Sequence, residues 1–418
     1  MKSLSKKNLL NEAAWSLTGK IISALGTLVG VRLLTEYARK EIYGKVGLLV
    51  AAMTLGMNLF ASPLTSAAQR FYSDQALRGQ VPLLRNTLIS LLKWPAVILG
   101  TTILLLMFFA RSIPDSVLLT LAFLLVFQVI YNLEVSLLTA ARRQKEVAFL
   151  GLSQTWLKPG FAVLAIILLG VSPFSILLGY SIATGGILLL FYLLPVQVEG
   201  VSRPSKPLKP DRNLVNNIFR YSFPLMPLAL VSWITSLSDR YIIGGTLGLG
   251  QVGIYTAGYG LISMPFLMVE GIIGQTLRPA YFQSVSSIDS ITEKKILRYH
   301  LITTVGICVI GVLAVCFFKN LIAQLFLAKE YREAAILLPW IAVGISFQVI
   351  SQIFEGVLIA YKKTLRLLMV HSLGAVISVV SVFLLCSRFG LSGAAVACPL
   401  YYLSMVVAGI ALTSKLIK

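Results

Sequence analysis

Apolar stretches long enough to cross a membrane recur along the whole chain, separated by short polar segments. A helix of about 20 apolar residues spans the hydrocarbon core of a bilayer. The pattern predicts twelve spans, at residues 13–34, 43–68, 84–110, 114–141, 148–170, 174–196, 216–238, 251–279, 297–318, 334–361, 367–387 and 391–414. No segment between them is long enough for a soluble catalytic domain, so we expect an all-α polytopic membrane protein.

The polar signals near the first spans return in the second half of the chain. Two arginines and a glycine recur in the same order with nearly constant offset: Arg32, Gly44 and Arg70 against Arg240, Gly253 and Arg278. Such regularity predicts an internal duplication. We expect two six-helix bundles, at residues 1–196 and 216–418, joined by a linker at 197–215 that is rich in proline and basic residues.

The distribution of Lys and Arg predicts the orientation. These residues concentrate in the N-terminal segment, the linker and alternate loops, which places both termini and the linker in the cytoplasm. The basic N-terminal segment lacks the features of a cleaved signal peptide, so we expect a retained first span. Because each bundle has an even number of spans, the bundles should be related by a pseudo-two-fold axis along the membrane normal.

Composition narrows the function classes further. The chain is 57% hydrophobic and 12% charged, against roughly 25% charged residues in soluble domains. The net charge of +20 is explained mostly by basic cytoplasmic loops, so no nucleic-acid partner is expected. The four cysteines lie in apolar helices, and no metalloprotease, phosphate-binding or nucleophile-elbow motif is present. We therefore expect no catalytic residue, cofactor or metal, and a protein that is not an enzyme.

Three lysines fall inside predicted spans of the first half: Lys20, Lys93 and Lys158. A central, unpaired lysine costs about 2.5–3.5 kcal/mol on insertion scales. One interpretation is that each side chain reaches the interface or pairs with an acid. The other is that the first bundle presents a cationic cleft to an anionic cargo, since the corresponding second-half positions are uncharged.

Three acids also fall inside spans: Glu134, Glu270 and Glu355. Glu134 and Glu355 occupy equivalent positions in the two copies. They are candidates for ion or proton coupling, and the alternative is a structural polar contact near the interface.

At Asn8–Trp15, Arg32, Tyr43-Gly44 and Gln69-Arg70-Phe71 the sequence resembles the Wzx-type polysaccharide and O-antigen flippases of the multidrug/oligosaccharidyl-lipid/polysaccharide (MOP) exporter superfamily. The resemblance covers the whole chain. It implies alternating access that moves undecaprenyl-diphosphate-linked oligosaccharide from the cytoplasmic to the periplasmic leaflet of the bacterial inner membrane. It also implies a cationic cavity at Lys20, Arg70, Lys93 and Lys158, with Arg278 contributed by the second bundle.

The expected partners are the lipid-linked glycan, membrane lipids, and the polymerase and glycosyltransferases of the same pathway. Lipid II flippases usually carry two further C-terminal spans, which counts against that assignment. A cation-coupled multidrug antiporter of the same superfamily is the main alternative, although it would favour acids over lysines deep in the first bundle. A membrane-embedded polysaccharide polymerase is an alternative from another class, but it would require a long catalytic loop.

Overall fold

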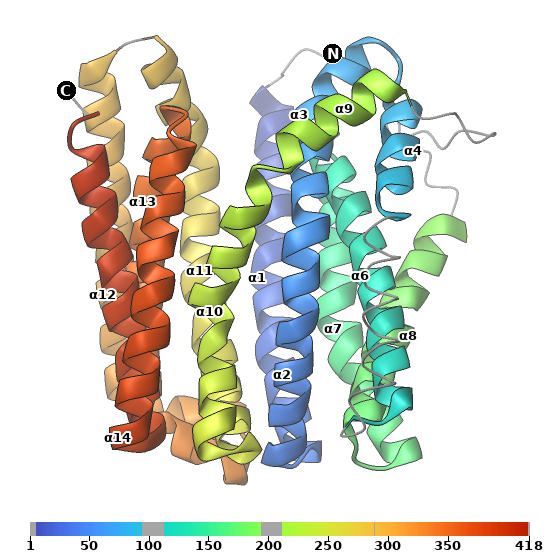
Figure 1. Cartoon of the computed structure of the whole chain (residues 1–418), viewed down its shortest axis with the longest axis vertical. Coiled ribbons are helices and arrows are strands. Elements are labelled where there is room, and N and C mark those ends of the chain that lie inside the picture. The colour runs from blue at the N-terminus through green and yellow to red at the C-terminus, as the bar shows by residue number, and fades with distance from the viewer. Residues whose placement is uncertain (1–5, 94–112, 194–210, 288, 417–418) are drawn as a thin grey trace. The chain divides into compact units, whose positions relative to one another are not determined.

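The computed structural model describes residues 6–93, 113–193, 211–287 and 289–416, with the backbone alone for residues 6–13. Every regular element in these ranges is a helix, which confirms the predicted all-α class (Figure 1). The elements are α1 (Lys6–Tyr37), α2 (Lys40–Gly56), the π-helix η1 (Met57–Ala61), α3 (Ser62–Leu77), α4 (Val81–Leu91), α6 (Asp115–Ala140), α7 (Gln144–Leu169), α8 (Pro173–Leu193), α9 (Arg212–Ser222), α10 (Leu225–Leu247), α11 (Leu249–Ser286), α12 (Ser290–Phe326), the 3₁₀ helix η2 (Lys329–Ile336), α13 (Leu338–Ala360) and α14 (Thr364–Thr413).

Ten helical segments of the described residues are long and apolar enough to cross a membrane. One of them, α14, contains two predicted spans that meet at Gly390, where φ is +60°. Glycine adopts this conformation without a Cβ clash. The predicted span 84–110 begins in α4 and otherwise lies mostly outside the described residues. The chain is a multi-pass membrane protein.

Several helices are longer than the spans predicted for them. α11 has 38 residues and α12 has 37, so at 1.5 Å per residue each is about 55 Å long. The hydrocarbon core is only about 30 Å thick, so these helices project beyond it. The segment after residue 318, expected as a loop, continues α12 as far as Phe326. Hydropathy detects only the apolar part of a helix, so the predicted spans are shorter than the helices.

The chain forms two compact units. Unit 1 consists of Met1–Gly26 and Leu49–Leu230, and unit 2 consists of Thr27–Leu48 and Val231–Lys418. Unit 2 therefore includes the end of α1 and the start of α2. The bundle boundaries expected from the sequence, 1–196 and 216–418, stay a prediction.

In unit 1 the core is built around α6. Leu64 of α3, Leu84 of α4, Leu137 of α6 and Ile218 of α9 belong to one buried cluster. Figure 1 shows α9 beside α3 and α4, against which it packs. A second cluster joins α6 to α7 and α8. These contacts place the middle sections of α6, α7 and α8 side by side.

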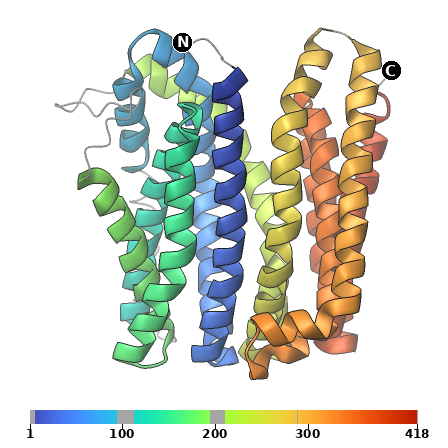
Figure 2. The same ribbon diagram turned by 180° about the vertical axis from the view of Figure 1, so that it is seen from behind.

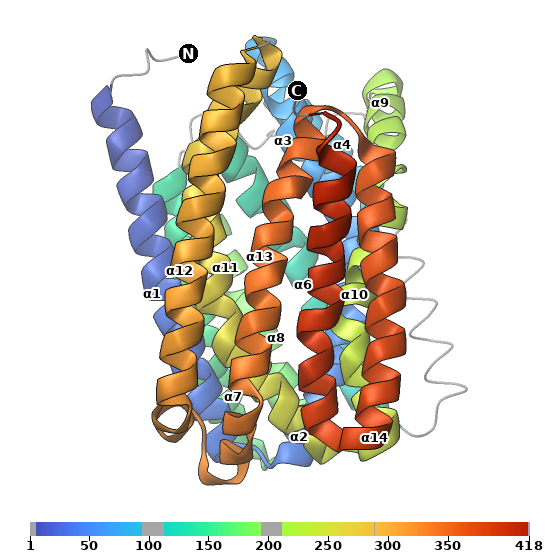
Figure 3. The same ribbon diagram turned by 90° about the vertical axis from the view of Figure 1, so that its left-hand side faces the viewer.

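In unit 2 the central helix is α13, which packs against α11, α12 and α14. Figure 3 shows the two halves of α14 beside α13, and Figure 2 shows α11 and α12 next to each other. The clustered side chains include Tyr281, Leu297, Ile353 and Val357. The polar residues of α11, α13 and α14 are thereby brought together inside one unit.

Two glycines identified from the repeat touch each other in unit 2. A Cβ added to Gly44 would lie 2.0 Å from the carbonyl oxygen of Leu249, and one added to Gly253 would lie 2.1 Å from that of Lys40. These contacts are reciprocal, because Lys40 and Leu249 precede the two glycines by the same number of residues. Only glycine allows α2 and α11 to approach this closely.

The helix η2 holds the end of α1 in unit 2. The Tyr331 hydroxyl donates to the carbonyl of Ala38 at 2.8 Å, and the Ala328 amide donates to Thr35 Oγ1 at 3.2 Å. Tyr331 is fully buried, and burial raises the pKa of its hydroxyl. These contacts, together with the glycine pair, explain why Thr27–Leu48 belongs to unit 2.

Candidate functional site

Lys158 lies near the middle of α7, at the centre of a polar cluster in unit 1. Its Nζ donates to Gln128 Oε1 of α6 at 2.7 Å and lies 6.0 Å from the centre of the Tyr180 ring of α8. Gln154 Nε2 donates to the same Gln128 oxygen at 3.0 Å, and Gln128 Nε2 donates to Asn132 Oδ1 at 3.2 Å. A lysine and three amides are therefore joined across two helices.

No carboxylate among the described residues lies within 4 Å of Lys158 Nζ. Its ammonium group is solvated by an amide dipole and an aromatic face, not neutralised by a counter-charge. Position 158 is about 21 Å from the start of α7 at 1.5 Å per residue, too deep for the side chain to reach the interface easily. The structure thus places a lysine without an acidic partner in the interior of unit 1.

The other predicted cations of unit 1 have different surroundings. Lys20 is half-buried on α1, whereas Arg70 on α3 and Lys93 just beyond α4 are exposed. Their assignment to a binding cavity stays a prediction.

Glu134 forms a buried ion pair with Arg85 of α4, a residue that was not among the predicted site residues. Arg85 Nη2 donates to Glu134 Oε1, and the Tyr192 hydroxyl donates to the same oxygen at 2.6 Å. Arg85 and Glu134 are both buried. Because this carboxylate is already neutralised, it does not offset any of the three lysines. Its role in ion coupling stays a prediction.

In unit 2, Glu270 binds two cationic or basic partners. Its Oε1 accepts from Arg278 Nη2 at 2.6 Å, and its Oε2 lies 3.0 Å from His300 Nε2 of α12. Glu270 and His300 are buried, while the Arg278 side chain is 41% exposed. Arg278, predicted to bind cargo, is thus also the counter-ion of a predicted coupling acid.

Glu355 has a histidine partner as well. Its Oε2 lies 3.4 Å from His371 Nε2 of α14, and its Oε1 accepts from Ser351 Oγ at 2.9 Å. His371 Nδ1 lies 3.1 Å from Ser232 Oγ of α10. Neither His300 nor His371 was among the predicted site residues. Their pairing with acids depends on which helices meet, and no local motif signals it.

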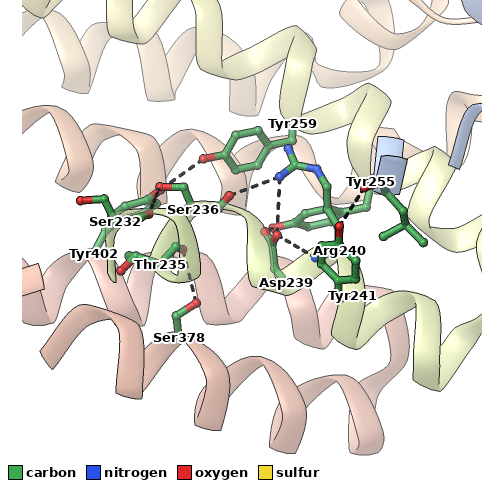
Figure 4. A network of polar contacts seen from close by, with 11 residues as sticks. Ser232, Thr235, Ser236, Asp239, Arg240, Tyr241, Tyr255, Tyr259, Ser378 and Tyr402 are labelled. Carbon is green, nitrogen blue, oxygen red and sulfur yellow. Dashed lines mark hydrogen bonds and ion pairs between the residues drawn. The ribbon is translucent and has the colours of Figure 1, made fainter. Parts of the chain in front are cut away.

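One further acid was missed because the predicted span ended one residue too early. Asp239 of α10 is fully buried and accepts from the Tyr255 hydroxyl at 2.7 Å (Figure 4). The adjacent Arg240 lies 3.6 Å from it and stacks on the Tyr259 ring at 5.0 Å. Tyr259 in turn contacts Tyr402 at 3.3 Å. The sequence signal that could have indicated this buried acid is the adjacent pair Asp239-Arg240 directly after the predicted apolar span.

The described residues contain no group of three or more His, Cys, Asp or Glu side chains suited to hold a metal ion. The clusters are therefore arrangements of charge and hydrogen bonds: one cation with amides in unit 1, and acid–base pairs in unit 2.

Comparison with known families shows to which family the chain belongs. Residues 9–285, more than half of the sequence, match the family described as polysaccharide biosynthesis protein. The chain belongs to this family. Residues 224–384 also match the family described as MatE. No curated protein sequence matches the chain.

Solved structures agree on the fold. An inward-facing multidrug resistance transporter of the MATE family, a member of the MOP superfamily, superposes with a TM-score of 0.74 at 13% identity, covering 97% of this chain and 98% of the other. The lipid II flippase MurJ in an inward closed conformation superposes with a TM-score of 0.69 at 14% identity, covering 95% of this chain and 87% of the other. A third structure is a MOP superfamily transporter from Pyrococcus furiosus, described as having a binding pocket of reverse polarity. It superposes with a TM-score of 0.63 at 15% identity, covering 99% of this chain and 97% of the other.

These findings confirm the resemblance to the MOP superfamily that the sequence suggested. The chain is a membrane transporter of this superfamily with the fold shared by MATE transporters and MurJ.

Proposed function

We propose that this transporter flips undecaprenyl-diphosphate-linked oligosaccharide repeat units from the cytoplasmic to the periplasmic leaflet of the bacterial inner membrane. It works by alternating access, with both termini in the cytoplasm, during cell-surface polysaccharide synthesis. The family match supports a role in polysaccharide biosynthesis. The observation that carries the choice of cargo is the charge of Lys158.

A lysine retained deep in a span without a counter-ion is costly and points to a functional role. Lys158 meets this description, since its described partners are an amide oxygen and an aromatic ring. A diphosphate would supply the missing negative charge and gain charge-assisted hydrogen bonds from the ammonium group. An anionic lipid carrier therefore suits unit 1.

The amides around Lys158 suit the rest of such a cargo. Gln128, Gln154 and Asn132 can each donate and accept hydrogen bonds, as sugar hydroxyls do. An amide cluster beside a lysine thus offers matching groups for a sugar next to a diphosphate.

The alternative is a cation-coupled multidrug antiporter, and the match to the MatE family and the similarity to MATE structures favour it. A cationic drug would be repelled by Lys158. Glu134, a buried acid of unit 1, is already paired with Arg85. The charge inside this unit therefore favours the anionic cargo.

The test is flipping of lipid-linked oligosaccharide in proteoliposomes, combined with glycan export in a deletion strain. Lys158→Ala should lower both about 10-fold or more, the effect of losing a hydrogen bond to a charged group of about 1.5–3 kcal/mol. Lys158→Arg should retain part of the activity, because it keeps the charge.

Arg332→Ala, which removes an exposed cation on η2, is the control and should behave as wild type. Normal flipping by Lys158→Ala at normal protein level would rule out the anionic-cargo mechanism. Efflux of cationic dyes that Lys158→Ala leaves intact or improves would favour the antiporter.

A further inference from the structure

We propose that the short helix α9 of unit 1 (Arg212–Ser222) is a docking surface for anionic phospholipids of the membrane. The rings of Phe219 and Phe223 lie among the lipids. The side chains of Arg212 and Arg220 bind the headgroup phosphates. None of these residues belongs to the Lys158 cluster, so the surface is separate from the proposed cargo site.

One face of α9 is fixed to the body of unit 1. Leu214 and Ile218 are buried in the cluster shared with α3, α4 and α6, and the Ser222 hydroxyl donates to the Pro63 carbonyl at 3.1 Å. Leu214, Ile218 and Ser222 follow one another at intervals of four residues, so they lie on one side of the helix. These contacts set the rotation of α9 about its own axis, and with it the direction in which its other faces point.

A second face of α9 is apolar but remains open. Phe219 and Phe223 are also four residues apart, and their side chains are 57% and 58% exposed. The two rings stack on each other, with their centres 5.7 Å apart. A helix that packs against a protein in water needs only one apolar face, and α9 has two. Because exposing large aromatic side chains to water is unfavourable, the second face calls for an apolar environment.

The remaining surface of α9 is polar and basic. Asn217 and Arg220 are exposed, and so is Arg212 at the start of the helix. Arg212 precedes Phe219 by seven residues, which places it on the same side as the two rings. Among the described residues, no acid forms an ion pair with either arginine. The only acid beside them in sequence, Asp211, caps α9 by accepting from a backbone amide at 3.0 Å. Two cations are therefore available to an anionic partner.

The position of α9 brings this surface to the bilayer. Only Phe223 and Pro224 separate α9 from α10, and the two helices together form a segment apolar enough to cross a membrane. Figure 1 shows α9 slanting across α3, at the end of unit 1 where α1 begins. A slanted helix that leads directly into a span lies at the level of the lipid headgroups, where aromatic side chains are enriched.

The chemistry of α9 favours lipid over a protein partner. An amphipathic helix at the membrane surface buries its apolar face about 5–10 Å into the boundary between headgroups and acyl chains, and its basic residues attract anionic lipids. An arginine can bind a phosphate through two parallel hydrogen bonds. Rings beside cations thus match acyl chains beside phosphates, and the continuity of α9 with α10 puts such lipids within reach.

Spin labels test the depth of α9. Cys316→Ser first removes the cysteine that is exposed in the described part of the chain, and Phe219→Cys, Phe223→Cys or Asn217→Cys then carries the label. The full-length protein is placed in nanodiscs of phosphatidylcholine and phosphatidylglycerol. We expect labels at positions 219 and 223 to collide more often with oxygen, which concentrates in lipid, than with a water-soluble nickel chelate. The label at position 217, exposed on the same helix, is the matched control and should show the reverse.

Native mass spectrometry tests the arginines. The double variant Arg212→Gln/Arg220→Gln should bind phosphatidylglycerol about 25-fold more weakly than wild type, because each basic residue near an anionic surface contributes a factor of about 5. Lys329→Gln/Arg332→Gln removes two exposed cations of η2 and should keep the wild-type affinity. Binding of phosphatidylcholine should be the same in all three proteins.

Labels at positions 219 and 223 that meet the nickel chelate as often as the label at 217 would place the rings in water and overturn the proposal. Spin–spin broadening between labels at 219 would assign the surface to a second copy of the chain, and labels shielded from both reagents would assign it to another protein segment. Either result contradicts a lipid surface. Equal affinity of the two double variants for phosphatidylglycerol would show that the arginines do not bind its headgroup.

Discussion

The two units bury charge in different ways. In unit 1 the lysine near the middle of α7, Lys158, contacts one amide oxygen and an aromatic ring, and no described carboxylate lies within 4 Å of it. In unit 2 each of the acids Glu270 and Glu355 lies against a histidine, and Arg278 donates to Glu270. The first arrangement leaves a cation to attract an anion, and the second pairs each acid with a basic side chain.

The largest effect should come from breaking the buried ion pair between Arg85 and Glu134. Arg85→Ala leaves Glu134 buried without its partner, which should destabilise the protein by about 3–5 kcal/mol. We expect severe loss of folded protein, measured by fluorescence-detected size-exclusion chromatography after heating. Arg78→Ala, at an exposed position beyond α3, is the matched control.

The double variant Arg85→Met/Glu134→Leu should recover most of the folded protein, because it removes both charges. If Arg85→Ala is as stable as Arg78→Ala, the pair does not hold unit 1 together.

A smaller effect is expected from the amides that surround Lys158. Gln128→Leu removes the acceptor that positions the ammonium group, so flipping in proteoliposomes should fall by about 10-fold. Gln154→Leu removes a neighbouring donor that does not contact Lys158 directly, and it should have a weaker effect. Equal rates for both variants and wild type would show that the cluster does not position Lys158 for transport.

The fold was predictable because hydropathy is a local and additive property. The spans at 114–141 and 148–170 agree with α6 and α7 within a few residues at each end. Errors arose where helices leave the hydrocarbon: α12 continues past the expected end of its span, and α10 includes Asp239. Water-exposed turns of a helix carry no apolar signal, so composition alone cannot find their ends.

The sequence by itself determined that this protein crosses the membrane many times, that its first half carries lysines in its spans, and that Gly44 and Gly253 are equivalent. The tertiary structure alone decided which of these charges have partners. Glu134 pairs with Arg85, Glu355 with His371, and Lys158 with an amide. The physical reason is that a charge's cost and function depend on the groups within a few ångströms of it, and those groups come from helices far apart in the chain.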